Sequence, residues 1–215
     1  MTTTSNKRTL FFGRILAFGA HSDDVEIGCA GFLAGTGSIF VTFTNGTYDS
    51  LVSVGETDSG KEQRDEEAEA AAKILGCLRR PLYVEQDDMY SRRRQIIANI
   101  GELITDTEAD TLLMHSEYDY HQDHRFVVEC VLSAARRYRG NIIFYKSPST
   151  RQEMMPNMFY HLTKADKERR VAALKCFESQ FDKPYFAGTM TQDMESFQIF
   201  RLSLNKGKDG NEIAT

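Results

Sequence analysis

Apolar stretches of strand length alternate with segments of helical period along most of this chain of 215 residues, and that alternation limits its fold more than any other feature. The run RILAFGA (14–20) predicts a buried strand, VEIGCAGFLAG (25–35) a helix, and SIFVTFT (38–44) a second strand. Strand, helix and strand in this order are typical of a parallel β-α-β unit. We therefore expect an α/β fold, a Rossmann-like three-layer sandwich in which helices flank a mostly parallel sheet.

The pattern repeats toward the C-terminus without an obvious domain break. Further strands are predicted at 81–85, 111–115, 141–146 and 196–204, and further helices at 61–76, after Ser91, at 123–139 and at 166–180. We expect one domain over 1–215, with an ordered core over about 14–204 and a flexible tail at 205–215. The polar loop at 45–60 is long, which indicates a functional or mobile segment.

Composition narrows the function classes. The formal net charge of −5 argues against a nucleic-acid surface, which relies on clustered Lys and Arg. The four cysteines form no C-x-x-C pair, which fits a reducing compartment, and the apolar N-terminal stretch is interrupted by Arg14. We expect a cytoplasmic protein without a membrane span.

The stretch AFGAHSDDVEIGCAG (17–31) places His21, Asp23 and Asp24 directly after the first predicted strand. Open α/β sheets bind ligands at the carboxyl ends of their strands, so this turn is a candidate site. The alternative for either aspartate alone is helix capping, since carboxylates accept bonds from the first N–H groups of a helix.

A second cluster, HSEYDYHQDHR (115–125), also follows a predicted strand and opens a predicted helix. A catalytic zinc typically takes three protein ligands from His and carboxylate side chains, and His21, Asp24 and His124 supply such a set. Two histidines and one carboxylate are also the ligand set of non-heme ferrous centres, so Zn²⁺ and Fe²⁺ both stay open. For His115 a structural role is the stronger hypothesis.

The remaining polar residues fit hydrolysis. Asp23 is the candidate general base, and His121 the candidate group for stabilising charge on a substrate carbonyl oxygen. Asp123 is the candidate partner that orients His121. Asp119 is a candidate for holding a ligand histidine from behind or for capping a turn.

These residues carry a family resemblance. AHSDDVEIGCAG resembles the A-H-P-D-D signature of the LmbE-like, or PIG-L, deacetylases, and DYHQDHR resembles their H-x-D-H element. RDEEAEAAAKILG is similar to the family's R-x-x-E helix, and AALKCFESQF to its segment ending in Ser-Gln. The likeness covers about residues 14–200.

The resemblance implies a zinc-dependent hydrolase that removes an N-acetyl group from an N-acetylglucosamine-type sugar or glycoconjugate, releasing acetate and a free amino sugar. By motif position, His21, Asp24 and His124 would be the metal ligands, Asp23 the base and then acid, and His121 with Asp123 the oxyanion-stabilising pair. Arg64, at R-x-x-E, would contact substrate, against the alternative of a surface ion pair. Related proteins also assemble as homo-oligomers.

Two positions depart from the family pattern, and two other classes compete. Ser22 stands where the family more often has proline, and Phe177 where it often has histidine. A dinucleotide-binding protein is disfavoured because no G-x-G-x-x-G follows the first strand. A non-catalytic metal- or sugar-binding module on the same fold is the remaining alternative, although the catalytic set is complete.

Overall fold

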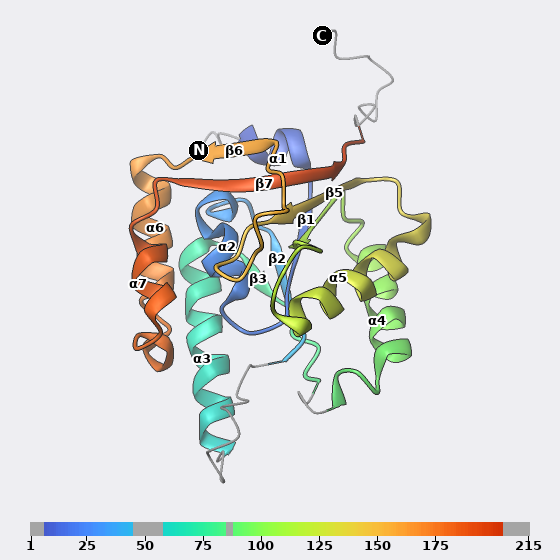
Figure 1. Cartoon of the computed structure of the whole chain (residues 1–215), viewed down its shortest axis with the longest axis horizontal. Helices are drawn as coiled ribbons and strands as arrows, with labels where there is room; N and C mark the ends of the chain where they lie inside the picture. The colour runs from blue at the N-terminus through green and yellow to red at the C-terminus, as the bar shows by residue number, and fades with distance from the viewer. Residues whose placement is uncertain (1–6, 45–57, 85–87, 204–215) are drawn as a thin grey trace, which may run out of the picture.

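The computed structural model describes residues 7–44, 58–84 and 88–203, and its centre is a seven-stranded sheet in the order β3-β2-β1-β4-β5-β7-β6 (Figure 1). Most of the loop predicted at 45–60 and the tail predicted at 205–215 lie outside these residues. The strands are β1 (Ile15–Gly19), β2 (Ile39–Thr42), β3 (Leu78–Arg79), β4 (Thr111–His115), β5 (Asn141–Tyr145), β6 (Met158–His161) and β7 (Met194–Arg201).

The first five strands of the sheet are parallel, as the β-α-β pattern predicts. β1 pairs with β2 on one side and with β4 on the other, so the strand order reverses at β1. A reversal of this kind leaves a crevice at the carboxyl ends of the two central strands, where open α/β sheets bind ligands. β7 and β6 extend the sheet beyond β5 in antiparallel pairing. The predicted fold class is confirmed.

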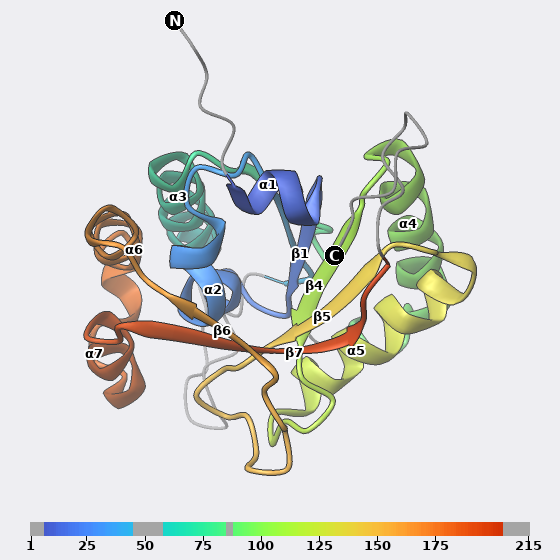
Figure 2. The same cartoon turned by 90° about the horizontal axis from the view of Figure 1, so that it is seen from above.

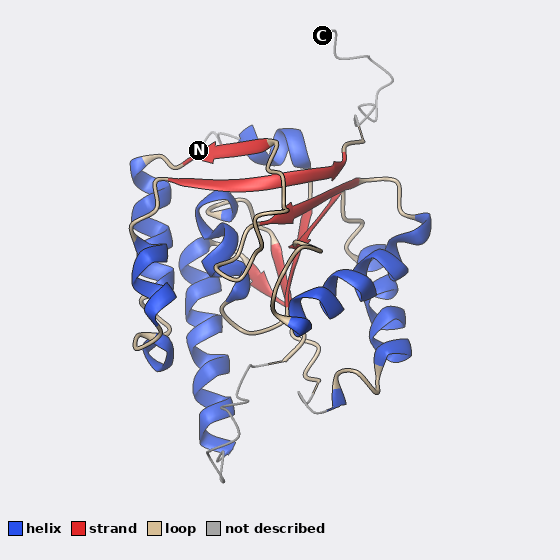
Figure 3. Cartoon of the chain, in the orientation of Figure 1, coloured by secondary structure: helices blue, strands red, loops and turns tan. Residues whose placement is uncertain are grey.

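Helices cover both faces of the sheet and give three layers (Figures 2 and 3). One face carries α2 (Asp24–Leu33), α3 (Asp58–Leu75), α6 (Lys164–Leu174) and α7 (Pro184–Met190), and the other carries α4 (Arg93–Asp106) and α5 (Gln122–Ala134). Each side has its own buried apolar cluster, with Phe32 and Leu113 in the first and Phe18 and Val127 in the second. The short helix α1 (Lys7–Phe12) precedes β1. Across the described residues, no helix is both long and apolar enough to cross a bilayer.

The edge of the sheet differs from its prediction. Strand pairing occurs at Leu78 and Arg79 rather than at the described part of the predicted strand, 81–84, and residue 85 lies outside the described residues. The N–H groups of Leu82 and Val84 still donate to β2 and to the residue after it. Pro81 has no N–H to donate, and Tyr83 has a positive φ of 50°. These two residues end the regular ladder early.

The secondary structure after β5 differs more from the prediction than that of the sheet edge does. The helix predicted at 166–180 is α6, which begins at Lys164 behind a Thr163–Asp166 capping box and ends at Leu174. Phe177 leaves the helical conformation and buries its ring near Phe186 of α7. The helix predicted at 123–139 likewise ends at Ala134 and continues as the 3-10 turn η2 (Ala135–Arg137). β6 and α7 were not predicted.

Helix α2 is broken in the middle, and a buried ion pair occupies the break. Cys29 has non-helical dihedrals, so the N–H groups of Gly31 and Phe32 donate to the Glu195 carboxylate of β7, at 2.9 and 2.7 Å. Arg170 of α6 pairs with that carboxylate and donates to the Ile27 carbonyl. Both charged side chains are 1% exposed. The ion pair therefore joins α2, α6 and β7.

We predict that Glu195→Ala lowers the free energy of unfolding by about 3–5 kcal/mol, because it leaves Arg170 buried without its counter-charge and two N–H groups without an acceptor. Urea unfolding followed by circular dichroism measures this loss. Asp193→Ala, which removes an exposed carboxylate paired with Lys167, is the control and should cost about 1 kcal/mol or less. Equal losses in the two variants would contradict the role assigned to Glu195.

Candidate metal and catalytic site

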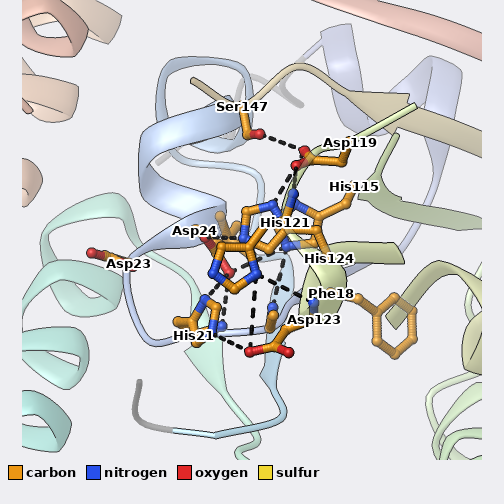
Figure 4. A network of polar contacts seen from close by, with 12 residues as sticks. Phe18, His21, Asp23, Asp24, His115, Asp119, His121, Asp123, His124 and Ser147 are labelled. Carbon is orange, nitrogen blue, oxygen red and sulfur yellow. Dashed lines mark hydrogen bonds and ion pairs between the residues drawn. The ribbon is translucent and has the colours of Figure 1, made fainter. Parts of the chain in front are cut away.

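The two sequence clusters meet at the reversal of strand order. His21 follows the carboxyl end of β1, His115 is the last residue of β4, and the loop after β4 delivers His121 and His124 to the start of α5. Figure 4 shows their side chains gathered around Asp24 of α2. The close approach of α2 to the sheet depends on Gly28, where an added Cβ would clash with the ring of Tyr145.

The Asp24 carboxylate is the centre of the cluster. Its oxygens lie 3.2 Å from His21 Nδ1, 3.2 Å from His115 Nε2 and 3.2 Å from His124 Nε2. Burial alone would raise the pKa of Asp24, but the neighbouring imidazoles hold that pKa well below its usual value. Asp24 also accepts the His21 N–H at 2.7 Å, so its side chain turns toward the preceding loop and the cluster.

Each of the two histidines predicted as ligands has a second carboxylate at its other ring nitrogen. His124 Nδ1 lies 3.2 Å from Asp119, and His21 Nε2 lies 3.2 Å from Asp123. Burial opposes protonation of both rings, yet the carboxylates raise the pKa of His21 to about 10 and that of His124 to about 9. The cluster thus favours positive charge.

The donor set fits a divalent metal. His21, His121 and His124 form one group of ligand-type atoms within 4.8 Å of one another, and Asp24, His115 and His124 form another. A carboxylate behind each imidazole fixes the ring orientation and raises its basicity, which is the usual arrangement behind metal-bound histidines. His21 Nδ1 and His124 Nε2 each lie 3.2 Å from an Asp24 oxygen. The set of His21, Asp24 and His124 stays a prediction, because neither group contains all three residues.

His115 is part of the cluster but differs in its environment. Its ring is fully buried and stacks on the ring of His124, with 3.7 Å between the two ring centroids. Its Nε2 accepts the Ala20 N–H at 3.2 Å. Burial, together with the nearby His124, lowers the pKa of His115 to about 4. A neutral ring with Nε2 already engaged supports the structural role expected for His115.

Asp23 lies on the same turn but outside the histidine cluster (Figure 4). Its side chain makes no capping hydrogen bond to α2, so the capping alternative is wrong for this residue. The Arg64 guanidinium of α3 lies 3.6 Å from the Asp23 carboxylate, and both side chains are buried. Burial raises the pKa of Asp23, while Arg64 opposes that rise.

His121 is the most exposed member of the cluster, with 43% of its side chain accessible. It is the N-cap of α5, and its Nδ1 accepts the Asp123 N–H at 3.2 Å. The neutral ring then carries its proton on Nε2, an assignment that follows from this hydrogen bond. The Asp123 carboxylate lies 3.9 Å from His121 but 3.2 Å from His21, and it also accepts a short hydrogen bond of 2.5 Å from Tyr90.

A cavity of about 450 Å³ opens beside these groups. It is lined by Asp23, Asp24, Arg64 and the three histidines that sequence analysis placed in the site, and also by residues that it missed: Ile27, Pro148, Ser149, Gln180, Lys183 and Tyr185. Two of them lay inside motifs that the sequence analysis quoted: Ile27 in AHSDDVEIGCAG and Gln180 in the Ser-Gln pair. Ser179 contacts α3, because its N–H and hydroxyl both donate to Glu67, at 2.9 and 2.6 Å.

The two departures from the family pattern lie in apolar or tightly packed surroundings. Ser22 is fully buried in the turn between β1 and α2. Phe177 is fully buried in the apolar cluster on the α2 side of the sheet. Neither residue lines the cavity.

Comparisons with solved structures agree with this fold. The chain superposes on the 4-carboxy-2-hydroxymuconate hydratase GalB of Pseudomonas putida KT2440 with a TM-score of 0.75 and 19% identity, covering 90% of this chain and 99% of that one. It superposes on the N,N′-diacetylchitobiose deacetylase of Pyrococcus horikoshii with a TM-score of 0.68 and 16% identity, covering 92% and 87%. At these identities the likeness concerns the fold alone.

Comparisons of sequence show the family as well as the fold. The chain is 31% identical over 190 residues to the uncharacterized deacetylase YaiS of Escherichia coli K12, covering 83% of this chain and 96% of that protein. The pattern of the GlcNAc-PI de-N-acetylase family, PIG-L, matches residues 16–135, which contain every residue of the histidine and aspartate cluster. The chain therefore belongs to the PIG-L family of deacetylases.

Proposed function

We propose that this protein is a metal-dependent N-deacetylase that acts on an N-acetylglucosamine-type sugar or glycoconjugate. One observation carries the proposal: His21 and His124 each lie between Asp24 and a second carboxylate, and they border a cavity that Asp23 and His121 also line. A metal-ligand set, a separate carboxylate and a separate imidazole donor at one cavity are the parts that amide hydrolysis needs.

The ligands in this proposal are His21, Asp24 and His124, with zinc as the favoured ion and ferrous iron as the alternative. When bound, the metal supplies Lewis acidity toward a carbonyl oxygen and toward water. Asp119 and Asp123 hold the far nitrogens of the two histidines and so keep the coordinating nitrogens turned inward.

In this proposal, side chains of the protein transfer the proton and stabilise the developing charge. Asp23 takes a proton from the water that attacks the acetamide carbon, and passes it to the nitrogen as the carbon–nitrogen bond breaks. His121 donates from Nε2 to the carbonyl oxygen as negative charge develops there. The products are acetate and a free amine. The charge of Arg64 opposes the rise in the pKa of Asp23 that burial causes, and Arg64 lines the cavity as the proposed contact for substrate hydroxyls.

We predict about one zinc or iron ion per purified wild-type chain and loss of that ion in His124→Ala, because His124 belongs to both groups of ligand-type atoms and each group without it has only two residues. Elemental mass spectrometry on both proteins, purified identically, measures the metal content. His161→Ala removes an exposed histidine on β6 and should retain the ion. A wild-type chain that holds no metal even after zinc is supplied would remove the basis of the proposal.

We predict that Asp23→Asn lowers the turnover of N-acetylglucosamine by about 10²–10⁴-fold, the usual contribution of a general acid–base group, while the metal content stays unchanged. Acetate release measures the turnover. Asp106→Asn, an exposed substitution at the end of α4, is the matched control. Full activity of Asp23→Asn would refute the assigned base. Metal binding by the wild type without acetate release from any N-acetylated sugar would favour the non-catalytic binding module instead.

We predict that Asp119→Ala weakens metal affinity by about 10–100-fold, because His124 loses the carboxylate that orients its ring. Competition with a chelator of known affinity measures the change without relying on activity. Asp119→Asn retains an oxygen that accepts the His121 N–H and should fall between the two proteins. Unchanged metal affinity in Asp119→Ala would show that Asp119 only caps the turn before α5 and does not support the metal site.

A further inference from the structure

Tyr90 reaches the candidate metal site from a part of the chain that neither histidine cluster includes. Its hydroxyl donates a hydrogen bond of 2.5 Å to one carboxylate oxygen of Asp123, Oδ1. The other oxygen of that carboxylate, Oδ2, lies 3.2 Å from His21 Nε2 (Figure 4). A series of polar contacts therefore runs from Tyr90 through Asp123 to a histidine that we propose as a metal ligand.

The turn before α4 holds Tyr90 in place. At its start, the Asp88 carbonyl accepts the Arg92 N–H at 3.0 Å, and the Asp88 carboxylate accepts from the Arg92 guanidinium at 2.6 Å. Met89 is fully buried in the apolar cluster on the α5 side of the sheet. The Tyr90 ring packs against Phe126 of α5, with 4.8 Å between the two ring centroids. Because backbone and ring are both held, the hydroxyl is directed at the carboxylate.

This hydrogen bond bears on which histidine the carboxylate supports. Asp123 Oδ2 lies 3.2 Å from His21 Nε2 but 3.9 Å from His121 Nδ1, and rotation of the aspartate side chain could bring it toward either ring. The Tyr90 hydroxyl binds Oδ1 and so leaves Oδ2 beside His21. His121 Nδ1 accepts the Asp123 N–H and therefore has no proton to donate to the carboxylate in the neutral ring.

We propose that Tyr90 is a positioning residue that strengthens metal binding by holding the Asp123 carboxylate against His21. The inference rests on the metal ligands of the proposed function but not on hydrolysis. Tyr90 does not line the catalytic cavity, so its effect passes through Asp123. A carboxylate behind a ligand histidine raises metal affinity because it fixes the orientation of the ring and increases its basicity.

The test is a double-mutant cycle on zinc affinity, measured by competition with a chelator of known affinity. Tyr90→Phe removes the hydroxyl and keeps the ring against Phe126. We expect Asp123→Ala to weaken zinc binding by about 10–100-fold, and Tyr90→Phe, one contact further from the metal, by about three- to tenfold. In the Asp123→Ala background, Tyr90→Phe should change the affinity by less than about 1.5-fold, because the hydroxyl has already lost its carboxylate.

Tyr83→Phe is the matched control. It removes the same atom from a tyrosine that is 68% exposed at the edge of the sheet, and it should bind zinc like the wild type. Far-UV circular dichroism of all the variants shows whether each one is folded before its affinity is measured.

The outcomes separate this role from a merely structural one. Equal weakening by Tyr90→Phe with and without the Asp123 carboxylate would mean that Tyr90 acts through packing, and would overturn the positioning role. Unchanged zinc affinity in Tyr90→Phe would overturn it as well.

The outcomes also separate this proposal from the hydrolytic function. The expected cycle in a protein that releases no acetate from any N-acetylated sugar would support the role of Tyr90 and overturn the hydrolysis. Acetate release by a protein whose zinc affinity does not depend on Tyr90 would leave the proposed function standing and overturn the inference. A wild type that binds no zinc would overturn both.

Discussion

The buried Glu195 carboxylate at the break in α2 is the interaction on which the arrangement of this molecule depends. It accepts from the first free N–H groups of the second half of the helix, and Arg170 neutralises its charge. A helix start buried without such an acceptor would be costly, and so would either charge without the other. Because α2 begins with Asp24, the same interaction ties the antiparallel end of the sheet to the residue at the centre of the candidate metal site.

In the candidate metal site, as at Glu195, each buried charge has an opposite charge beside it. Three carboxylates, from Asp24, Asp119 and Asp123, are buried against histidine rings, and a cluster of acids at this depth requires compensating positive charge. The carboxylates raise the pKa of His21 to about 10 and that of His124 to about 9, so positive charge is favoured at this position. In the proposed function a divalent cation would supply that charge. Asp23 lies outside the cluster, next to Arg64, so it is a candidate for proton transfer rather than coordination.

The sequence predicted the parts of the molecule whose signals are local. The periodicity of 14–44 located β1, α2 and β2. The polar residues at two strand ends predicted that His21 and His124 lie close together, because the carboxyl ends of neighbouring parallel strands share one edge of a sheet. The pairing of Asp123 with His21, which lies closer than His121, depends on side-chain geometry and has no sequence signal. The segment after β5 was predicted poorly because burial of Phe177, not helix propensity, decides where α6 ends.

That poorly predicted segment also lines a second cavity of about 530 Å³, which shares Ile27, Pro148 and Tyr185 with the first. The parallel strands β1 and β4 place the histidines and aspartates at the reversal of strand order, a position that the fold itself determines. A hydratase shares this fold with deacetylases, so the fold does not decide the reaction. The second cavity, in contrast, is lined mainly by α7, the loop after β5 and the start of β7, together with Ile27 and Gly28 of α2. Of these elements only α2 contributes a candidate metal ligand, Asp24, so residues of the other three can change without loss of the metal site.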